Sequence, residues 1–334
     1  MKKTLLYAAL IAAFSSSAFA REQIQIVGSS TVYPFATIVA ERFGQGGNKT
    51  PVIESTGTGG GMKLFCKGIG VDKPDVTNAS RAIKKSELEL CKKNGVTPVE
   101  FIVGNDGLAF AQSLQGTPMN LGIEHIAVAL AAEFASDMKT WADVDAFVAE
   151  KTGTTKLGLP AREINVMIPP PTSGTRDAMG ELFMKHGYKS LGIKGSGYKK
   201  IREDGAAIQM GENDNLIVEK LVTDPNMFGI FGYSFFDTNR DKVQASDLNG
   251  VKLSFDSIAS YEYPGARPLY IYVKNEHVGI IPGLDVFVQE FISERAMSVD
   301  GYLFPAGLVP LSEKDFATQI AQRDKLVNRQ IASK

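Results

Sequence analysis

Four times along the chain, a short apolar run is followed by a polar or glycine-rich turn with hydroxyl groups, and then by the start of a helical pattern. These turns lie at residues 28–31, 56–61, 75–81 and 169–177. Strand-like runs that alternate with helical runs are typical of an α/β protein, in which ligands bind at the carboxyl ends of strands. The sequence therefore predicts an α/β fold with its binding residues in these turns.

The fourth turn carries two hydroxyls, a glycine and a cation, in the order Ser173, Gly174, Thr175 and Arg176. The start of a helix has about four backbone N–H groups without internal partners and roughly half a positive charge, so it attracts oxyanions. Serine and threonine are also common as plain helix N-caps. An anion site and a simple cap are both open from this turn alone.

The other three turns offer similar groups. Ser30 and Thr31 close the first, where we expect Thr31 to be the N-cap of a helix with Pro34 in its first turn. Ser80 and Arg81 close the third. The glycine-rich second turn lacks the spacing of a nucleotide-binding loop, because Lys63 is followed by leucine. Its glycines allow the backbone to approach a ligand closely.

Between the turns, the patterns predict the following elements. Residues 125–160 are expected to be helical, with Trp141 as a core residue or an anchor between domains rather than a ligand contact. Further helices are expected at 176–187 and 206–222. Two strands, 99–103 and 108–111, are joined by a glycine-containing break and are candidates to cross between domains, with a return strand at 267–273. A helix near the end is expected to bury Val286, Phe287, Phe291 and Ile292.

Length and charge narrow the functional classes. A chain of 334 residues fits two domains, and a formal net charge of −1 excludes a general basic surface for nucleic acid. The three histidines, His125, His186 and His277, are far apart in the sequence, so we expect no metal ion and no other cofactor. The motifs G-x-S-x-G and H-E-x-x-H of common hydrolases are absent from the sequence.

Residues 1–20 are expected to be a secretory signal peptide, with a basic start, an apolar core and an A-x-A cleavage site before Arg21. The apolar core is only about half the roughly 20 residues needed to span a membrane. Export favours one disulfide bond between the two cysteines, Cys66 and Cys91, over two buried thiols.

Taken together, the chain resembles the periplasmic phosphate-binding proteins, which are the substrate-binding components of high-affinity phosphate ABC transporters. The resemblance covers essentially the whole mature chain. It lies in the order and spacing of six stretches, at residues 28–34, 55–61, 78–81, 140–144, 172–176 and 307–311.

The resemblance implies a two-lobed periplasmic-binding-protein fold of type II, in which each lobe is a mixed sheet flanked by helices and two hinge strands join the lobes. Lobe I would comprise residues 21–104 and 265–334, and lobe II residues 105–264. It also implies a monomeric periplasmic protein without enzymatic activity that delivers inorganic phosphate to a membrane permease. The implied phosphate ligands are Ser30, Thr31, Ser80, Ser173, Gly174 and Thr175.

Two positions depart from the family. Many members carry an arginine where this chain has Pro169, and an aspartate where it has Arg81. We therefore expect Arg81, Arg176 or both to supply the missing positive charge. A carboxylate must then accept the phosphate proton, and Asp106 is the first candidate and Asp177 the second.

Three alternatives remain open at this point. The same fold could bind another oxyanion such as sulfate or molybdate, and only the acceptor carboxylate would discriminate between these ligands. The chain could instead be an exported phosphate-ester hydrolase, or an adhesin built on the same fold.

Overall fold

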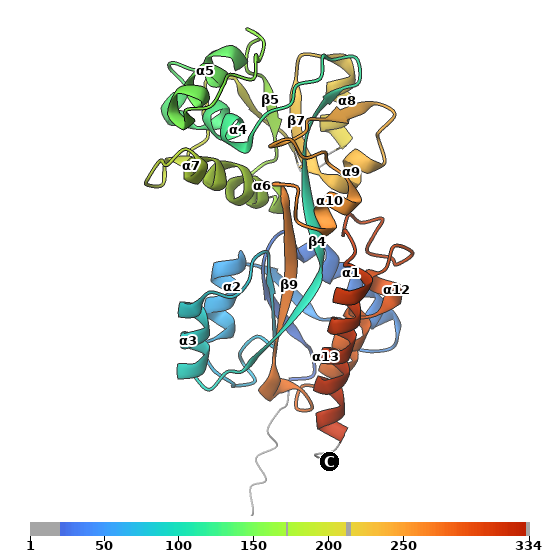
Figure 1. Ribbon diagram of the computed structural model, residues 1–334. Helices are drawn as coiled ribbons and strands as arrows, with labels where there is room; N and C mark the ends of the chain where they lie inside the picture. Colours follow the sequence, from blue (N-terminus) through green and yellow to red (C-terminus); the bar gives the residue numbers. More distant parts are fainter. Residues whose placement is uncertain (1–20, 172, 212–214, 332–334) are drawn as a thin grey trace, which may run out of the picture.

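The computed structural model describes residues 21–171, 173–211 and 215–331, so the expected signal peptide lies outside the described residues. The chain folds into two α/β lobes, one above the other in Figure 1, which are connected by long strands that run between them. This is the two-lobed mixed α/β architecture that the sequence predicts.

The sheet of the first lobe has the strand order β2-β1-β3-β9-β4. Strand β1 pairs in parallel with both β2 and β3, whereas β9 is antiparallel to its two neighbours. The strands span Gln25–Gly28 (β1), Val52–Ser55 (β2), Val76–Ala79 (β3), Pro98–Ser113 (β4) and Ala266–Lys274 (β9).

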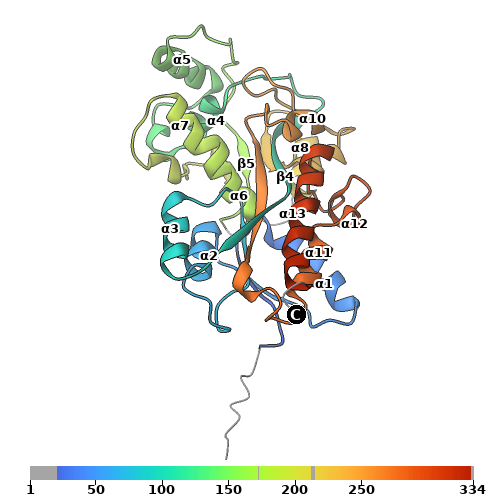
Figure 2. The same cartoon turned by 60° about the horizontal axis from the view of Figure 1, so that its bottom comes forward.

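Helices cover both faces of this sheet. Figures 1 and 2 show α2 and α3 on one side of β4 and β9, and α1, α11 and α13 on the other. The helices span Tyr33–Gln45 (α1), Thr58–Phe65 (α2), Lys85–Lys93 (α3), Leu284–Phe291 (α11), Glu294–Met297 (α12) and Glu313–Ile331 (α13). A short 3₁₀ turn, Asn275–His277, follows β9.

The second lobe has the strand order β4-β7-β5-β6, with β8 on the other edge of β4. Strand β5 is parallel to both β6 and β7, and β4 is antiparallel to β7 and β8. The further strands span Val166–Ile168 (β5), Ala207–Gln209 (β6), Phe228–Gly232 (β7) and Val243–Ala245 (β8).

A nearly continuous helical segment runs from Gly174 to Ser190, with α6 (Gly174–Met179), a π-helical stretch (Gly180–Lys185) and α7 (His186–Ser190). The other helices are α4 (Ile123–Leu130), α5 (Trp141–Thr152), α8 (Asn215–Thr223), α9 (Tyr233–Asp237) and α10 (Phe255–Ala259). Two 3₁₀ turns span Ala132–Phe134 and Gly197–Lys199.

Each lobe has its own hydrophobic core. In the second, the fully buried Trp141 packs edge-on against Phe110 and Phe228, with ring centroids 5.9 and 5.6 Å away, so the expectation that this residue belongs to a core is confirmed. In the first, Phe43 of α1 meets Phe287 of α11 at 5.7 Å.

Three details of the predicted elements are wrong. In the range 125–160, which was expected to be helical, residues 131, 135–140 and 153–160 lie outside helices, since α5 ends at Thr152. Val286 is 44% exposed, because the helix there turns Leu284 and Val288 toward the core in its place. The expected helix at 206–222 begins only at Asn215, since residues 207–209 add strand β6 to the edge of the sheet.

Strand β4 joins the lobes without interruption over its 16 residues. The expected break is a bulge at Gly104, where the register to β9 shifts and the backbone takes a φ of 155°. A side chain here would meet Leu308 at 2.5 Å. The lobe boundaries expected at 104/105 and 264/265 lie at this bulge and just before β9, and they stay a prediction.

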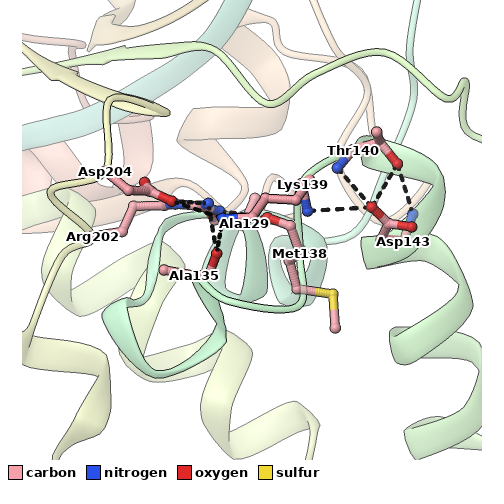
Figure 3. A network of polar contacts seen from close by, with 8 residues as sticks. All are labelled: Ala129, Ala135, Met138, Lys139, Thr140, Asp143, Arg202 and Asp204. Atoms are coloured by element: carbon pink, nitrogen blue, oxygen red, sulfur yellow. Dashed lines mark hydrogen bonds and ion pairs between the residues drawn. The ribbon is translucent and has the colours of Figure 1, made fainter.

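The second lobe contains a buried arginine that ties several segments together. Arg202 is 2% exposed, and its guanidinium donates to the carbonyls of Ala129, Ala135 and Met138 and to both oxygens of Asp204 (Figure 3). Ala129 lies at the carboxyl end of α4, where carbonyl groups lack helical partners. Arg202 thereby caps this helix and anchors the chain that follows it.

The expected disulfide bond between Cys66 and Cys91 is present. It closes a loop of 25 residues between the end of α2 and α3, and both cysteines are buried. Replacing both with alanine is expected to lower the free energy of unfolding by about 3 kcal/mol, because the unfolded chain regains the entropy of the open loop. Urea denaturation of the variant and of the oxidised protein measures this, and equal midpoints and slopes would contradict it.

Candidate functional site

A cavity of about 510 Å³ lies between the lobes, where the carboxyl ends of the parallel strands meet. Six of the nine predicted ligand residues line it: Ser30, Thr31, Asp106, Ser173, Gly174 and Thr175. The remaining lining residues are Tyr33, Pro34, Phe35, Ser55, Gly232, Phe235, Ala306 and Gly307. The cavity is thus hydroxyl-rich on two sides and partly apolar at its walls.

The wall from the first lobe is the turn between β1 and α1. Pro34 lies in the first turn of α1, as expected, but the N-cap is Val32 rather than Thr31. Thr31 therefore has a different contact: its Oγ1 donates to the carbonyl of Gly174 in the other lobe, at 3.0 Å. Its neighbour Ser30 donates across the same gap to Asp177 Oδ2, at 2.8 Å.

The wall from the second lobe is the turn between β5 and α6. Ser173 is the N-cap of α6, and its Oγ accepts a hydrogen bond from the Thr175 N–H at 3.1 Å. A hydroxyl that accepts in this way keeps its own proton, which it can donate to an anion. Ser173, Gly174 and Thr175 thus present donors beside the positive end of a helix.

Gly174 is the point of closest approach between the lobes. A Cβ atom built on it would lie 2.4 Å from both N and Cα of Thr31, which are backbone atoms and cannot rotate away. Glycine is therefore required at this position for the two turns to touch.

Replacing Gly174 with alanine is expected to hold the lobes apart and to weaken ligand binding at least about tenfold, a cost of about 1.4 kcal/mol. Small-angle scattering with and without ligand would show a missing compaction, and titration calorimetry would give the affinity. Gly180→Ala is the matched control, because a Cβ there meets nothing within 4 Å in the same helical segment. Unchanged compaction and affinity in Gly174→Ala would contradict the contact.

Two charged residues come from the hinge strands. Asp106 lines the cavity, and Arg267 lies behind the wall in contact with the lining residues Asp106 and Thr31. Arg267, only 7% exposed, donates from Nη2 to Thr31 Oγ1 at 2.9 Å and from Nε to Asp106 Oδ2 at 3.2 Å. The other carboxylate oxygen of Asp106 makes no hydrogen bond within the described residues. The site therefore holds one buried cation and one carboxylate oxygen that is open to a proton donor.

Sequence reasoning missed Arg267 as a site residue. The sequence feature that could have indicated Arg267 is its place at the start of the predicted return strand. In the structure, Arg267 on β9 pairs with Asp106 on β4. A register between strands 161 residues apart cannot be obtained from local patterns.

Three predicted ligand residues do not line the cavity. Arg81 forms a two-pronged ion pair with Glu87 at 2.8 and 2.9 Å, and this hydrogen bonding raises the pKa of its guanidinium. Ser80 Oγ lies 3.0 Å from Thr58 Oγ1. Arg176 donates from Nη1 to the Pro169 carbonyl at 2.8 Å, and burial lowers its pKa. The structure thus brings neither candidate arginine to the cavity wall.

Comparison with known proteins assigns the family. The PBP superfamily domain matches residues 14–295. The chain belongs to this superfamily. Its PBP relatives include "Protein SphX" of Synechococcus elongatus, 28% identical over 94% of this chain and 88% of that protein, and "Phosphate-binding protein PstS" of Staphylococcus saprophyticus, 27% identical over 90% and 84%.

Solved PBP-type structures have the same fold. The crystal structure of "a possible phosphate binding protein" from Planctomyces limnophilus superimposes with a TM-score of 0.71 at 26% identity, and covers 91% of this chain and 98% of its own. An ABC-type phosphate transport receptor from Vibrio cholerae superimposes with a TM-score of 0.60 at 20% identity, over 86% and 99%. The second similarity concerns the fold alone.

The geometry of this PBP cleft suits an oxyanion. Hydroxyls from both lobes and a helix start converge on the cavity, and a guanidinium contacts two of the lining residues from behind. Within residues 21–331, apart from positions 172 and 212–214, no group of acidic, histidine and cysteine side chains is arranged to hold a metal ion. Over the same residues, no helix is long and apolar enough to cross a membrane.

Proposed function

We propose that this chain is a periplasmic substrate-binding protein that captures inorganic phosphate between its lobes and delivers it to a membrane ABC permease. The observation that carries the proposal is the convergence of Thr31, Ser173 and Thr175 on one cavity. Behind that lining, the guanidinium of Arg267 donates to Thr31 Oγ1. The names of the relatives, phosphate-binding proteins among them, support phosphate as the ligand.

Arg267 supplies the positive charge that the resemblance assigns to the position of Pro169. Its guanidinium is planar, permanently charged and already oriented by Thr31 and Asp106, so little side-chain entropy is lost when an anion binds. Ser30 and Gly174 contribute by closing the two turns over the ligand.

Asp106 supplies selectivity. Its second oxygen accepts a hydrogen bond from a protonated phosphate oxygen, whereas sulfate has no proton at neutral pH and would place two acceptors in contact. Such an unpaired contact costs several kcal/mol when it is buried, so the cleft discriminates phosphate from sulfate and from molybdate.

We expect phosphate to bind at least about 100-fold more tightly than sulfate, because an unpaired buried acceptor costs about 1–3 kcal/mol on each side of the contact. In Asp106→Asn the amide can donate, so the ratio of the two affinities is expected to fall at least about tenfold. Titration calorimetry of the mature protein with both anions measures the ratio.

Two outcomes of these titrations would contradict the proposal. Equal binding of phosphate and sulfate by the unchanged protein would favour a general oxyanion receptor. Full discrimination in Asp106→Asn would remove Asp106 from its role and leave Asp177 as the remaining candidate.

The partner, the oligomeric state and the lack of catalysis are part of the same proposal. We expect a monomer whose closed form is recognised by the permease in the periplasm. Purified protein incubated with 4-nitrophenyl phosphate is expected to release no product, and steady release would instead support the hydrolase alternative.

A further inference from the structure

A second cavity, of about 440 Å³, lies at the far end of the second lobe. It is formed by the loop after β4, the loop before β5 and the turn after α8, and is lined by Thr117, Pro118, Met119, Asn120, Leu157, Gly158, Leu159, Pro160, Arg162 and Asn226. Asp106 in the cleft and Ser113 at the end of β4 are seven residues apart on one strand, roughly 23 Å. The cavity is therefore separate from the cleft between the lobes.

Arg162 is the only charged residue among the described residues that line this cavity. Its Cζ lies 4.9 Å from the centre of the Phe228 ring, and its Nη2 makes two long contacts, of 3.5 Å to Gln112 Oε1 and 3.9 Å to Met119 Sδ. Its Nε is buried without a hydrogen-bond partner, and no carboxylate of the described residues accepts from it. A half-buried guanidinium with so few partners is costly unless something else completes its bonding.

The surroundings do not neutralise this charge. Asp224 interacts electrostatically with Arg162 but does not form a hydrogen bond with it. The Oδ1 atom of Asp224 accepts a hydrogen bond from the backbone N–H of Asn226. Burial lowers the pKa of Arg162, which is the direction expected for an uncompensated cation.

Arg202 in the same lobe shows how a purely structural arginine is satisfied here. It donates to three carbonyls and pairs with Asp204 through two short contacts (Figure 3). Within the described residues, Arg162 has neither a carboxylate nor a backbone carbonyl as an acceptor, only the long contacts to Gln112 Oε1 and Met119 Sδ. The contrast indicates that the guanidinium of Arg162 is kept for a ligand.

We propose that this cavity is a second binding site, for a small organic carboxylate, with Arg162 as its anchor. The guanidinium fork matches the two oxygens of a carboxylate, and the ring of Phe228 supports its flat face. Leu159, Pro118 and Pro160 line the walls and favour a ligand with an apolar body over an inorganic anion. Thr117, Asn120 and Asn226 offer further polar contacts at the same cavity.

Benzoate is a suitable probe, with benzamide as its neutral match. In ¹H–¹⁵N spectra of the mature protein with inorganic phosphate present, benzoate is expected to shift the amide signals of the residues other than proline at 117–120 and 157–162 in a saturable manner. Benzamide has no charge for Arg162 to pair with, so it is expected to bind at least about tenfold more weakly. Shifts that do not saturate, or equal binding of both probes, would overturn the proposal.

Two variants locate the response. Arg162→Met removes the cation and keeps the apolar stem, and is expected to abolish the benzoate response. Leu157 lines the cavity and is 55% exposed, so Leu157→Glu places a negative charge there without disturbing the core. This variant is expected to weaken benzoate binding at least about tenfold. If both variants are folded, as judged by well-dispersed amide signals, and bind benzoate as the unchanged protein does, the assignment of the site to this cavity is wrong.

Discussion

Replacing Arg267 with methionine is expected to weaken phosphate binding by about 100-fold to 1,000-fold. A hydrogen bond to a charged group contributes about 1.5–3 kcal/mol, and the variant also leaves the Asp106 carboxylate facing the anion without its cation. Both effects act against the same ligand, and Arg267 is buried, so solvent screens its charge weakly. Titration calorimetry on folded, mature protein measures the loss.

The matched controls for this prediction are the two arginines that the sequence favoured. Arg81→Met and Arg176→Met remove a cation near the cleft. Neither side chain donates to a residue that lines the cavity, as Arg267 does to Thr31 and Asp106, so each variant is expected to change the affinity less than about tenfold. Arg267→Lys keeps the positive charge but loses the planar, two-pronged guanidinium. Its affinity for phosphate is expected to lie between those of Arg267→Met and the unchanged protein. A large loss in Arg176→Met together with normal binding in Arg267→Met would reverse the assignment.

The parts of the site that could be predicted from the sequence are those with local signals. Ser173 and Thr175 follow an apolar run and precede a helix, and all the groups that make this turn an N-terminal anion site lie within a few residues. The same holds for Ser30 and Thr31. Each of these two turns follows a strand, β1 or β5, that pairs in parallel with both of its neighbours.

What could not be predicted depends on distant pairing or on competition between neighbours. Arg267 reaches the cavity through its register with Asp106 across two strands. Arg81 does not reach the cavity because its guanidinium binds the carboxylate of Glu87, six residues later. That carboxylate is held beside Arg81 because it also accepts a hydrogen bond from the Lys84 N–H. A local pattern shows that a cation is near the turn, but it does not show which acceptor it will choose.

The second large effect concerns stability. Replacing Arg202 with methionine is expected to lower the free energy of unfolding by about 3–5 kcal/mol, because three buried carbonyls lose their donor and Asp204 loses its partner (Figure 3). Methionine keeps much of the volume, so the loss reflects the polar contacts more than a cavity. Urea denaturation at neutral pH measures the change in the free energy of unfolding. Arg295→Met is the control: the side chain of Arg295 is 71% exposed, so this substitution is expected to cost less than about 1 kcal/mol.

The loss in Arg202→Met is also expected to depend on pH. Hydrogen bonds from Arg202 hold the pKa of Asp204 below its ordinary value of 3.8, so this carboxylate stabilises the folded state above that pH and ceases to do so as the pH falls toward its lowered pKa. The difference in stability between the unchanged protein and Arg202→Met should therefore be smaller at about pH 3 than at neutral pH. An equal difference in stability at both pH values would show that the contacts to the backbone carbonyls alone cause the loss. If the control variant Arg295→Met were as unstable as Arg202→Met, Arg202 would have no special role in stability.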